Sequence, residues 1–179
     1  YEQIEYWMHE RVQMGEKVHL FGSIPCGPFS PLQNLNLAVQ GEPYQDYLQD
    51  QRRKSLDMVV KFNHLSEVAI LSGGTSSFEW PKECRGWKES EVLSMISRFN
   101  MFACYPTGCG FDLTIQGKKP LKEWRIVTTS QRLAFELNKY QCKHPPCFRH
   151  DDIIGGGHCR TKWILQPQNG NGNCFLIVS

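Results

Sequence analysis

The chain of 179 residues is 40% hydrophobic and 21% charged, with a formal net charge of +2. These values are ordinary for a single globular domain with a sizeable core. The charge is too small to indicate nucleic-acid binding by itself, and no apolar run approaches the roughly 18 residues that a membrane span needs. Residues 1–17 are too polar for a secretory signal peptide. Because the chain starts at Tyr1 rather than Met, we expect a piece of a longer protein.

Hydrophobic periodicity predicts two helices and two strands in the first half of the chain. Apolar residues at helical spacing indicate a helix over 2–14, and a longer stripe over 46–71 indicates the longest helix. Strands are expected at 18–24 and 75–80. Between the first strand and the long helix, residues 26–44 are rich in Pro, Gly and Asn, which predicts a long loop.

The second half is predicted to hold short elements and then a loop-rich end. The expected elements are a helix over 88–99, strands over 101–105, 110–115 and 124–128, and a helix that Ser130 caps and that runs to Leu137. Alternation of strands and helices followed by a cluster of strands predicts an α/β fold with a mixed, mostly parallel sheet. We expect one α/β domain over 1–138, with a Cys/His-rich loop region over 139–179 packed on it.

The eight cysteines bear on the cellular compartment. A chain with this much core does not need disulfides for stability. Three of the cysteines lie among histidines between residues 142 and 159, an arrangement that suits a metal better than disulfides. We therefore expect an intracellular protein, nuclear or cytoplasmic. The alternative is an extracellular, disulfide-linked binding module.

Cys26 and Glu79 are the candidate chemical groups of the α/β region. Each follows or ends a predicted strand, and ligands of α/β sheets bind at the carboxyl ends of strands. An exposed, activated thiolate at Cys26 would be a nucleophile. A carboxyl group at Glu79 would hydrogen-bond or protonate a ring nitrogen. The plainer interpretation is a buried cysteine and an ordinary strand-end carboxylate.

The order Pro25-Cys26 followed by Glu79-x-Pro81 resembles the C-terminal half of the DNA cytosine-5 methyltransferase family. The resemblance implies a Rossmann-like half domain and a nucleic-acid partner. It also implies that Cys26 attacks the base, that Glu79 holds the ring nitrogen and that Arg125 lines the base pocket. Trp80 stands where the family usually has Asn.

Longer shared words extend the resemblance to a methyltransferase-like segment in retrotransposon-type polyproteins of protists, and they imply a mobile-element origin. These words are Pro-Cys-x-x-Phe-Ser-x-x-Gln-Asn-Leu-Asn at 25–36, Phe-Glu-Trp-Pro at 78–81, Tyr-Pro-x-Gly-Cys-x-Phe-x-Leu at 105–113 and Trp-Arg-Ile-Val-Thr-Thr at 124–129.

The sequence lacks the glycine-rich turn and the acidic ribose partner that methyltransferases of this kind use for S-adenosylmethionine. We therefore expect the chain alone to bind that cofactor weakly or not at all, and its catalytic activity stays an open question. The alternative to a nucleic-acid-binding domain is a non-catalytic structural subunit or scaffold of a larger assembly, with other protein subunits as partners.

A cluster of cysteines and histidines follows Tyr140. Cys142, His144, Cys147 and His150 offer four ligands within nine residues, and Cys159 offers a fifth. Zinc takes four such ligands in tetrahedral geometry. We expect one structural zinc on Cys142, Cys147 and His150, with His144 or Cys159 as the fourth ligand. A disulfide between cysteines of this loop, or no special role, are the other interpretations.

Overall fold

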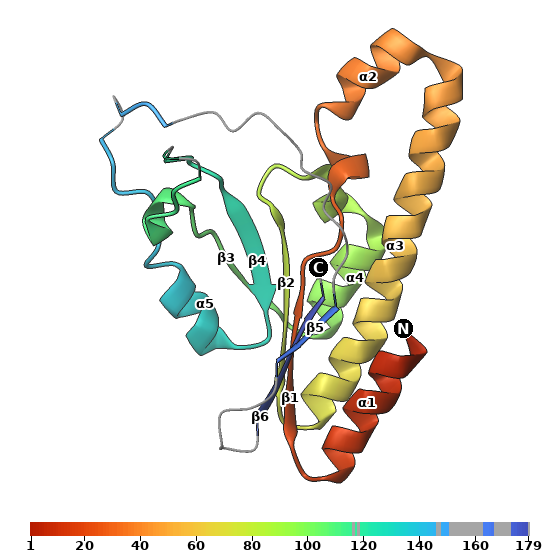
Figure 1. Ribbon diagram of the computed structural model, residues 1–179, viewed down its shortest axis with the longest axis vertical. Coiled ribbons are helices and arrows are strands. Elements are labelled where there is room, and N and C mark those ends of the chain that lie inside the picture. Colours follow the sequence, from red (N-terminus) through yellow and green to blue (C-terminus); the bar gives the residue numbers. More distant parts are fainter. Residues whose placement is uncertain (116, 118, 146–147, 151–162, 167–172, 179) are drawn as a thin grey trace.

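The computed structural model describes residues 1–115, 117, 119–145, 148–150, 163–166 and 173–178 (Figure 1). Its elements in chain order are α1 (Glu2–Gln13), β1 (Lys17–Gly22), the 3-10 turn η1 (Gly27–Phe29), α2 (Gln33–Gln40), α3 (Glu42–Leu71), β2 (Thr75–Pro81), the 3-10 turn η2 (Arg85–Lys88), α4 (Ser90–Arg98), β3 (Phe102–Cys104), the 3-10 turn η3 (Cys109–Phe111), β4 (Trp124–Thr128), α5 (Gln131–Leu137), β5 (Trp163–Gln166) and β6 (Asn173–Val178). No helix in the described part of the chain has the length and apolar character needed to cross a membrane.

The strands form one mixed sheet in the order β3-β4-β2-β1-β6-β5. Strand β1 runs parallel to both of its neighbours, β2 and β6. The pairs β2–β4, β3–β4 and β5–β6 are antiparallel. The predicted α/β class with a mixed sheet is therefore confirmed, but the prediction of a mostly parallel sheet is wrong. The reason is that β3 and β4 follow one another as neighbours in the sheet, as do β5 and β6, and consecutive strands joined without a crossover helix pair antiparallel.

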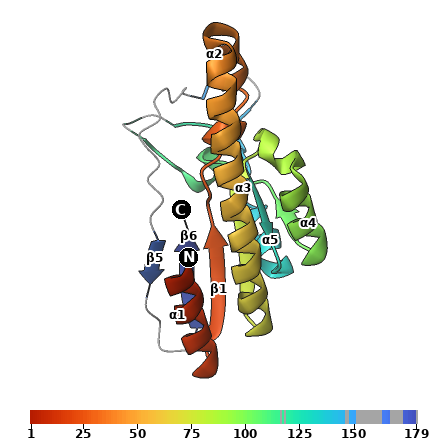
Figure 2. The ribbon, with the colours of Figure 1, turned by 90° about the vertical axis from the view of Figure 1, so that its right-hand side faces the viewer.

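Helices cover the sheet unequally on its two faces. Helices α1, α3 and α4 form a layer over one face, and Figure 2 shows them side by side. Helix α5 lies against β3 and β4 on the other face (Figure 1). The longest helix, α3, buries Val59, Phe62, Leu65 and Ala69 in the core it shares with β1 and β2. The N-terminal part of α3 extends beyond the sheet together with α2 (Figure 1).

An aromatic cluster joins the sheet to the turns that follow β1 and β2. Phe78 and Trp80 of β2 contact Trp87 of η2, with ring centroids 5.7 Å apart in each case. Phe29 of η1 packs on Trp80 at 5.5 Å. The Trp80 indole Nε1–H donates to the Ile24 carbonyl over 2.6 Å. These contacts place the chain around residue 26 against the end of β2.

Three local predictions differ from the structure. The expected loop over 26–44 contains η1 and α2, and α3 begins at Glu42, with Pro43 in its first turn, where proline is well tolerated. The expected strand over 110–115 is wrong, because η3 occupies its start and Asp112 takes a left-handed conformation that ends it. The expected loop-rich end contributes β5 and β6 to the sheet.

Candidate functional site

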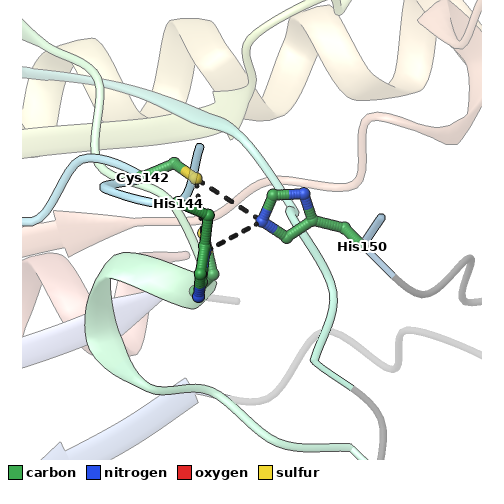
Figure 3. A group of neighbouring side chains, drawn as sticks. Cys142, His144 and His150 are labelled. Atoms are coloured by element: carbon green, nitrogen blue, oxygen red, sulfur yellow. Dashed lines mark hydrogen bonds between the residues drawn. The ribbon is translucent and has the colours of Figure 1, made fainter. Parts of the chain in front are cut away.

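Four side chains from two distant segments gather into a candidate metal centre. Cys109 comes from η3, between β3 and β4, whereas Cys142, His144 and His150 follow α5. Their sulfur and nitrogen atoms all lie within 4.8 Å of one another. Figure 3 shows Cys142, His144 and His150 pointing toward one another. This group of two thiols and two imidazoles could hold a metal ion such as zinc.

The spacing of three of the four donor atoms matches that of a tetrahedral site. Cys142 Sγ lies 3.5 Å from His144 Nδ1 and 3.4 Å from His150 Nε2, and the two imidazole nitrogens are 3.3 Å apart. Zinc–sulfur bonds of about 2.3 Å and zinc–nitrogen bonds of about 2.05 Å at tetrahedral angles place sulfur and nitrogen about 3.5 Å apart. The same geometry places two nitrogens about 3.3 Å apart. The three donors therefore fit one ion without rearrangement.

Backbone contacts between the two segments bring Cys109 to the group. Thr107 donates through its backbone N–H to the Tyr140 carbonyl over 2.9 Å, and the Gly110 N–H donates to Thr107 Oγ1 over 3.1 Å. A Cβ at residue 110 would overlap the Tyr140 carbonyl, so glycine permits this close approach. The Phe111 and Tyr140 rings stack with centroids 4.5 Å apart. These contacts fix the position of Cys109 beside Cys142.

Aromatic stacking and burial act on two members of the cluster, His144 and Cys109. The His144 ring stacks on Phe148, with centroids 4.0 Å apart, which limits the orientations of its nitrogens. Burial raises the pKa of the Cys109 thiol, the neighbouring Cys142 thiol adds to that rise, and a hydrogen bond from Thr107 opposes it. A metal ion would displace the thiol protons, as zinc does when it binds cysteine.

The structure brings together three of the five predicted metal ligands, Cys142, His144 and His150. The other two, Cys147 and Cys159, lie outside the described residues. Sequence reasoning missed Cys109, because it precedes the Cys/His cluster by a whole strand and helix. The available signal was its position between two glycines in a polar loop, where a side chain is presented by a tight turn.

The predicted pair Cys26 and Glu79 lies at the carboxyl edge of two adjacent parallel strands. Cys26 caps η1 just after β1, and Glu79 lies near the end of β2. Gly22 of β1 is in register with Phe78 of β2, so both chains leave the sheet at the same edge. Ser23 Oγ donates to Glu79 Oε2 over 2.6 Å. The Glu79 charge acts on the Cys26 thiol, so the two groups are electrostatic neighbours.

The pKa values of Cys26 and Glu79 are shifted in opposite directions, down for the thiol and up for the carboxyl group. A hydrogen bond from the Cys84 thiol lowers the pKa of Cys26, against the opposing effects of burial and of Glu79, and the Lys122 charge also lowers it. Burial raises the pKa of Glu79, although Ser23 and Lys122 oppose that rise. Relative to the free side chains, the site therefore shifts Cys26 toward the thiolate and Glu79 toward the protonated carboxyl group.

Arg125 is not part of this group. It pairs with Trp80 across β2 and β4, whereas Glu79 pairs with Ile126, so the side chains of Arg125 and Glu79 point to opposite faces of the sheet. The Arg125 guanidinium lies over the Trp87 ring at 4.5 Å from its centroid. Trp80 is 1% exposed, so its ring is part of the core.

A cavity of about 420 Å³ adjoins the candidate metal centre. Its lining includes Cys142, Thr107 and Tyr105 and the ion pair of Lys82 and Glu123. The Lys82 Nζ and Glu123 Oε1 atoms are 2.9 Å apart. The cavity thus has polar and charged walls at the edge of the sheet.

Comparisons with protein-family models, curated proteins and solved structures found no match to this chain.

Proposed function

We propose that the domain binds one zinc ion through Cys109, Cys142, His144 and His150 and that this ion is structural. The observation that supports it is the spacing of 3.3–3.5 Å among three of the donor atoms. Four protein ligands would leave no open coordination position, which is typical of structural and not of catalytic zinc. The ion would join the turn that carries η3 to the chain after α5.

Cobalt substitution tests this proposal directly. The purified chain is stripped of metal under reducing conditions, titrated with Co²⁺ and then with Zn²⁺, and followed by visible absorption and elemental analysis. We expect one equivalent of Co²⁺ to give the intense bands of a tetrahedral site with thiolate ligands, and Zn²⁺ to abolish them. His150→Ala should weaken the binding at least tenfold, whereas His64→Ala, an exposed histidine on α3, should not. Octahedral spectra, or equal binding by both variants, would exclude the site.

We also propose that the domain is methyltransferase-like and binds nucleic acid, with a pyrimidine base held by Cys26 and Glu79. The supporting observation is the pairing of a thiol with a lowered pKa and a carboxyl group with a raised pKa at one strand edge. Cys26 would add to the C6 carbon of the ring, and protonated Glu79 would donate a hydrogen bond to the N3 nitrogen. The base would have to leave the stack to reach these groups.

Methyl transfer would need a donor site, which we expect another chain or segment to supply. The proposed reaction of this chain is therefore limited to reversible thiol addition to the base. A mobile-element origin is consistent with such a partial domain and stays a prediction.

A base analogue with an electrophilic C6 carbon tests the base-binding proposal without a methyl donor. A single-stranded DNA oligonucleotide that carries 2-pyrimidinone is incubated with the chain, and the intact adduct is measured by mass spectrometry. We expect an adduct in the wild type and in Cys104→Ser, no adduct in Cys26→Ser and at least tenfold less in Glu79→Gln. Cys104 is a suitable control because it is fully buried in β3. Absence of both adduct and DNA binding at low salt would favour the alternative, a structural subunit of a larger assembly.

A further inference from the structure

A second pair of thiols lies apart from the candidate metal centre. Cys26 follows β1 and caps η1, and Cys84 follows β2 and caps η2. Cys84 belongs to the buried core cluster and Cys26 packs against that cluster, and each thiol shifts the acidity of the other, Cys84 acting as the hydrogen-bond donor. Cys84 is 6% exposed, whereas Cys26 is only half-buried.

The surroundings give the two thiols different roles. The Cys84 hydrogen bond and the positive charge of Lys122 stabilise negative charge on Cys26, which makes it the attacking sulfur. Contact with Cys26 and burial keep Cys84 protonated and out of reach of solvent. This division into an accessible attacking thiol and a buried second thiol is the arrangement of redox-active dithiols.

The positions of the two cysteines allow a covalent bridge. Both precede short 3-10 turns just beyond the ends of adjacent parallel strands. A disulfide requires sulfurs that face one another across a short gap. Cys26 packs against the core cluster that contains Cys84, and each thiol acts on the acidity of the other, so the two side chains are neighbours. Closing the bridge would join the two loops without breaking a strand pair.

We propose that Cys26 and Cys84 form a redox dithiol that reacts with low-molecular-weight disulfides and closes to a reversible intramolecular disulfide. The Cys26 thiolate attacks one sulfur of the small disulfide, whose S–S bond breaks, and the departing thiolate takes up a proton. Cys84 then loses its proton and attacks the Cys26 sulfur, which releases the second small thiol. Two electrons pass from the protein to the small disulfide, which is reduced to two thiols. Once it is in the bridge, Cys26 can no longer add to a base. Only this consequence depends on the proposed base-binding function.

Peptide mapping of the full chain tests the bridge. The zinc-treated protein is equilibrated in buffers of oxidised and reduced glutathione, quenched in acid, alkylated and digested with trypsin. Cleavage after Lys17, Arg52, Lys82 and Arg85 leaves Cys26 alone in peptide 18–52 and Cys84 alone in peptide 83–85. We expect these two peptides to appear cross-linked in the oxidising buffers and to separate after reduction.

Two single variants test the assigned roles. In Cys84→Ser, Cys26 should accumulate as a mixed disulfide with glutathione, because no second thiol resolves it. In Cys26→Ser, Cys84 should stay unmodified, because it is buried and has lost its partner. Cys104→Ser is the matched control and should form the bridge as the wild type does.

Three results would overturn the proposal. In the first, Cys26 stays reduced until the chain unfolds. In the second, Cys26 of the wild type remains a mixed disulfide with glutathione and forms no bridge. In the third, Cys84 is bridged to a cysteine other than Cys26. Because the mapping involves no nucleic acid, it separates failure of the dithiol from failure of the base-binding site.

Discussion

The hydrogen bond from Trp80 to the Ile24 carbonyl should control both stability and the position of Cys26. Trp80→Phe keeps a ring in the aromatic cluster and removes only the indole N–H and part of the ring volume. The bond is 2.6 Å long, and Ile24 is 3% exposed, so water does not replace the lost donor. Ile24 lies two residues before Cys26, which makes this bond a direct link between β2 and the Cys26 turn.

The magnitude follows from two separate costs. A buried carbonyl that loses its partner costs about 1–3 kcal/mol. The smaller ring leaves a small cavity, which adds about 1 kcal/mol. We therefore expect Trp80→Phe to lower the free energy of unfolding by about 2–4 kcal/mol.

Chemical denaturation and thiol alkylation measure the two effects. The matched control is Trp87→Phe, in the same cluster, whose indole donates to the Pro81 carbonyl over 2.9 Å. Both variants should lose stability, but only Trp80→Phe should speed alkylation of Cys26, read from peptide 18–52. A loss below about 1 kcal/mol would refute the role given to the hydrogen bond. Equal alkylation rates in the two variants would refute the link to Cys26.

Two further predictions concern Glu79 and the candidate metal centre. Burial raises the pKa of Glu79 in the folded chain above its value in the unfolded chain. The stability that this shift contributes is fully present below the unfolded-state pKa and is lost as pH rises through the folded-state pKa. Glu79→Gln should therefore be more stable than the wild type at pH 7 in urea denaturation, and the difference should disappear below about pH 4; a difference independent of pH would contradict this. Gly110→Ala, whose Cβ would overlap the Tyr140 carbonyl, should displace Cys109 and weaken Co²⁺ binding at least tenfold, whereas Gly27→Ala, with open space around its Cβ position, should leave the affinity unchanged.

Elements with strong local patterns were predictable from the sequence. Periodic apolar residues predicted α1, α3 and α4, and runs of β-formers predicted β1, β2 and β4. The Ser130 cap is confirmed, since its hydroxyl accepts a hydrogen bond from the Leu133 N–H over 3.2 Å. In each case the determining residues are neighbours in the chain.

The rest depends on contacts between distant segments. Strand β6 is inserted beside β1. The apolar run at 175–178 is a local strand pattern that the prediction of a loop-rich end overlooked, whereas the place of this strand in the sheet depends on its contact with β1. Cys109 joins the candidate metal centre only because the Thr107 N–H bonds to the Tyr140 carbonyl, a contact that neither segment specifies alone. That Cys26 and Glu79 lie near one another was predictable, because one follows β1 and the other lies near the end of β2, whereas the contact between Cys26 and Cys84 depends on how the turns after those strands fold.

The two cysteine sites differ in the neighbours that decide their chemistry. Cys109 and Cys142 lie beside two imidazoles, which add neutral ligands for a divalent ion. Cys26 and Cys84 lie beside Glu79, and the charged side chains that act on Cys26 in the described part of the chain are Glu79 and Lys122. A bound zinc ion would hold the first pair as thiolates and shield it from oxidants, so the second pair would be left as the reactive dithiol. Among the cysteines whose side chains the structure describes, metal loading should therefore confine oxidation to Cys26 and Cys84, and stripping the metal should add Cys109 and Cys142 to the oxidised thiols.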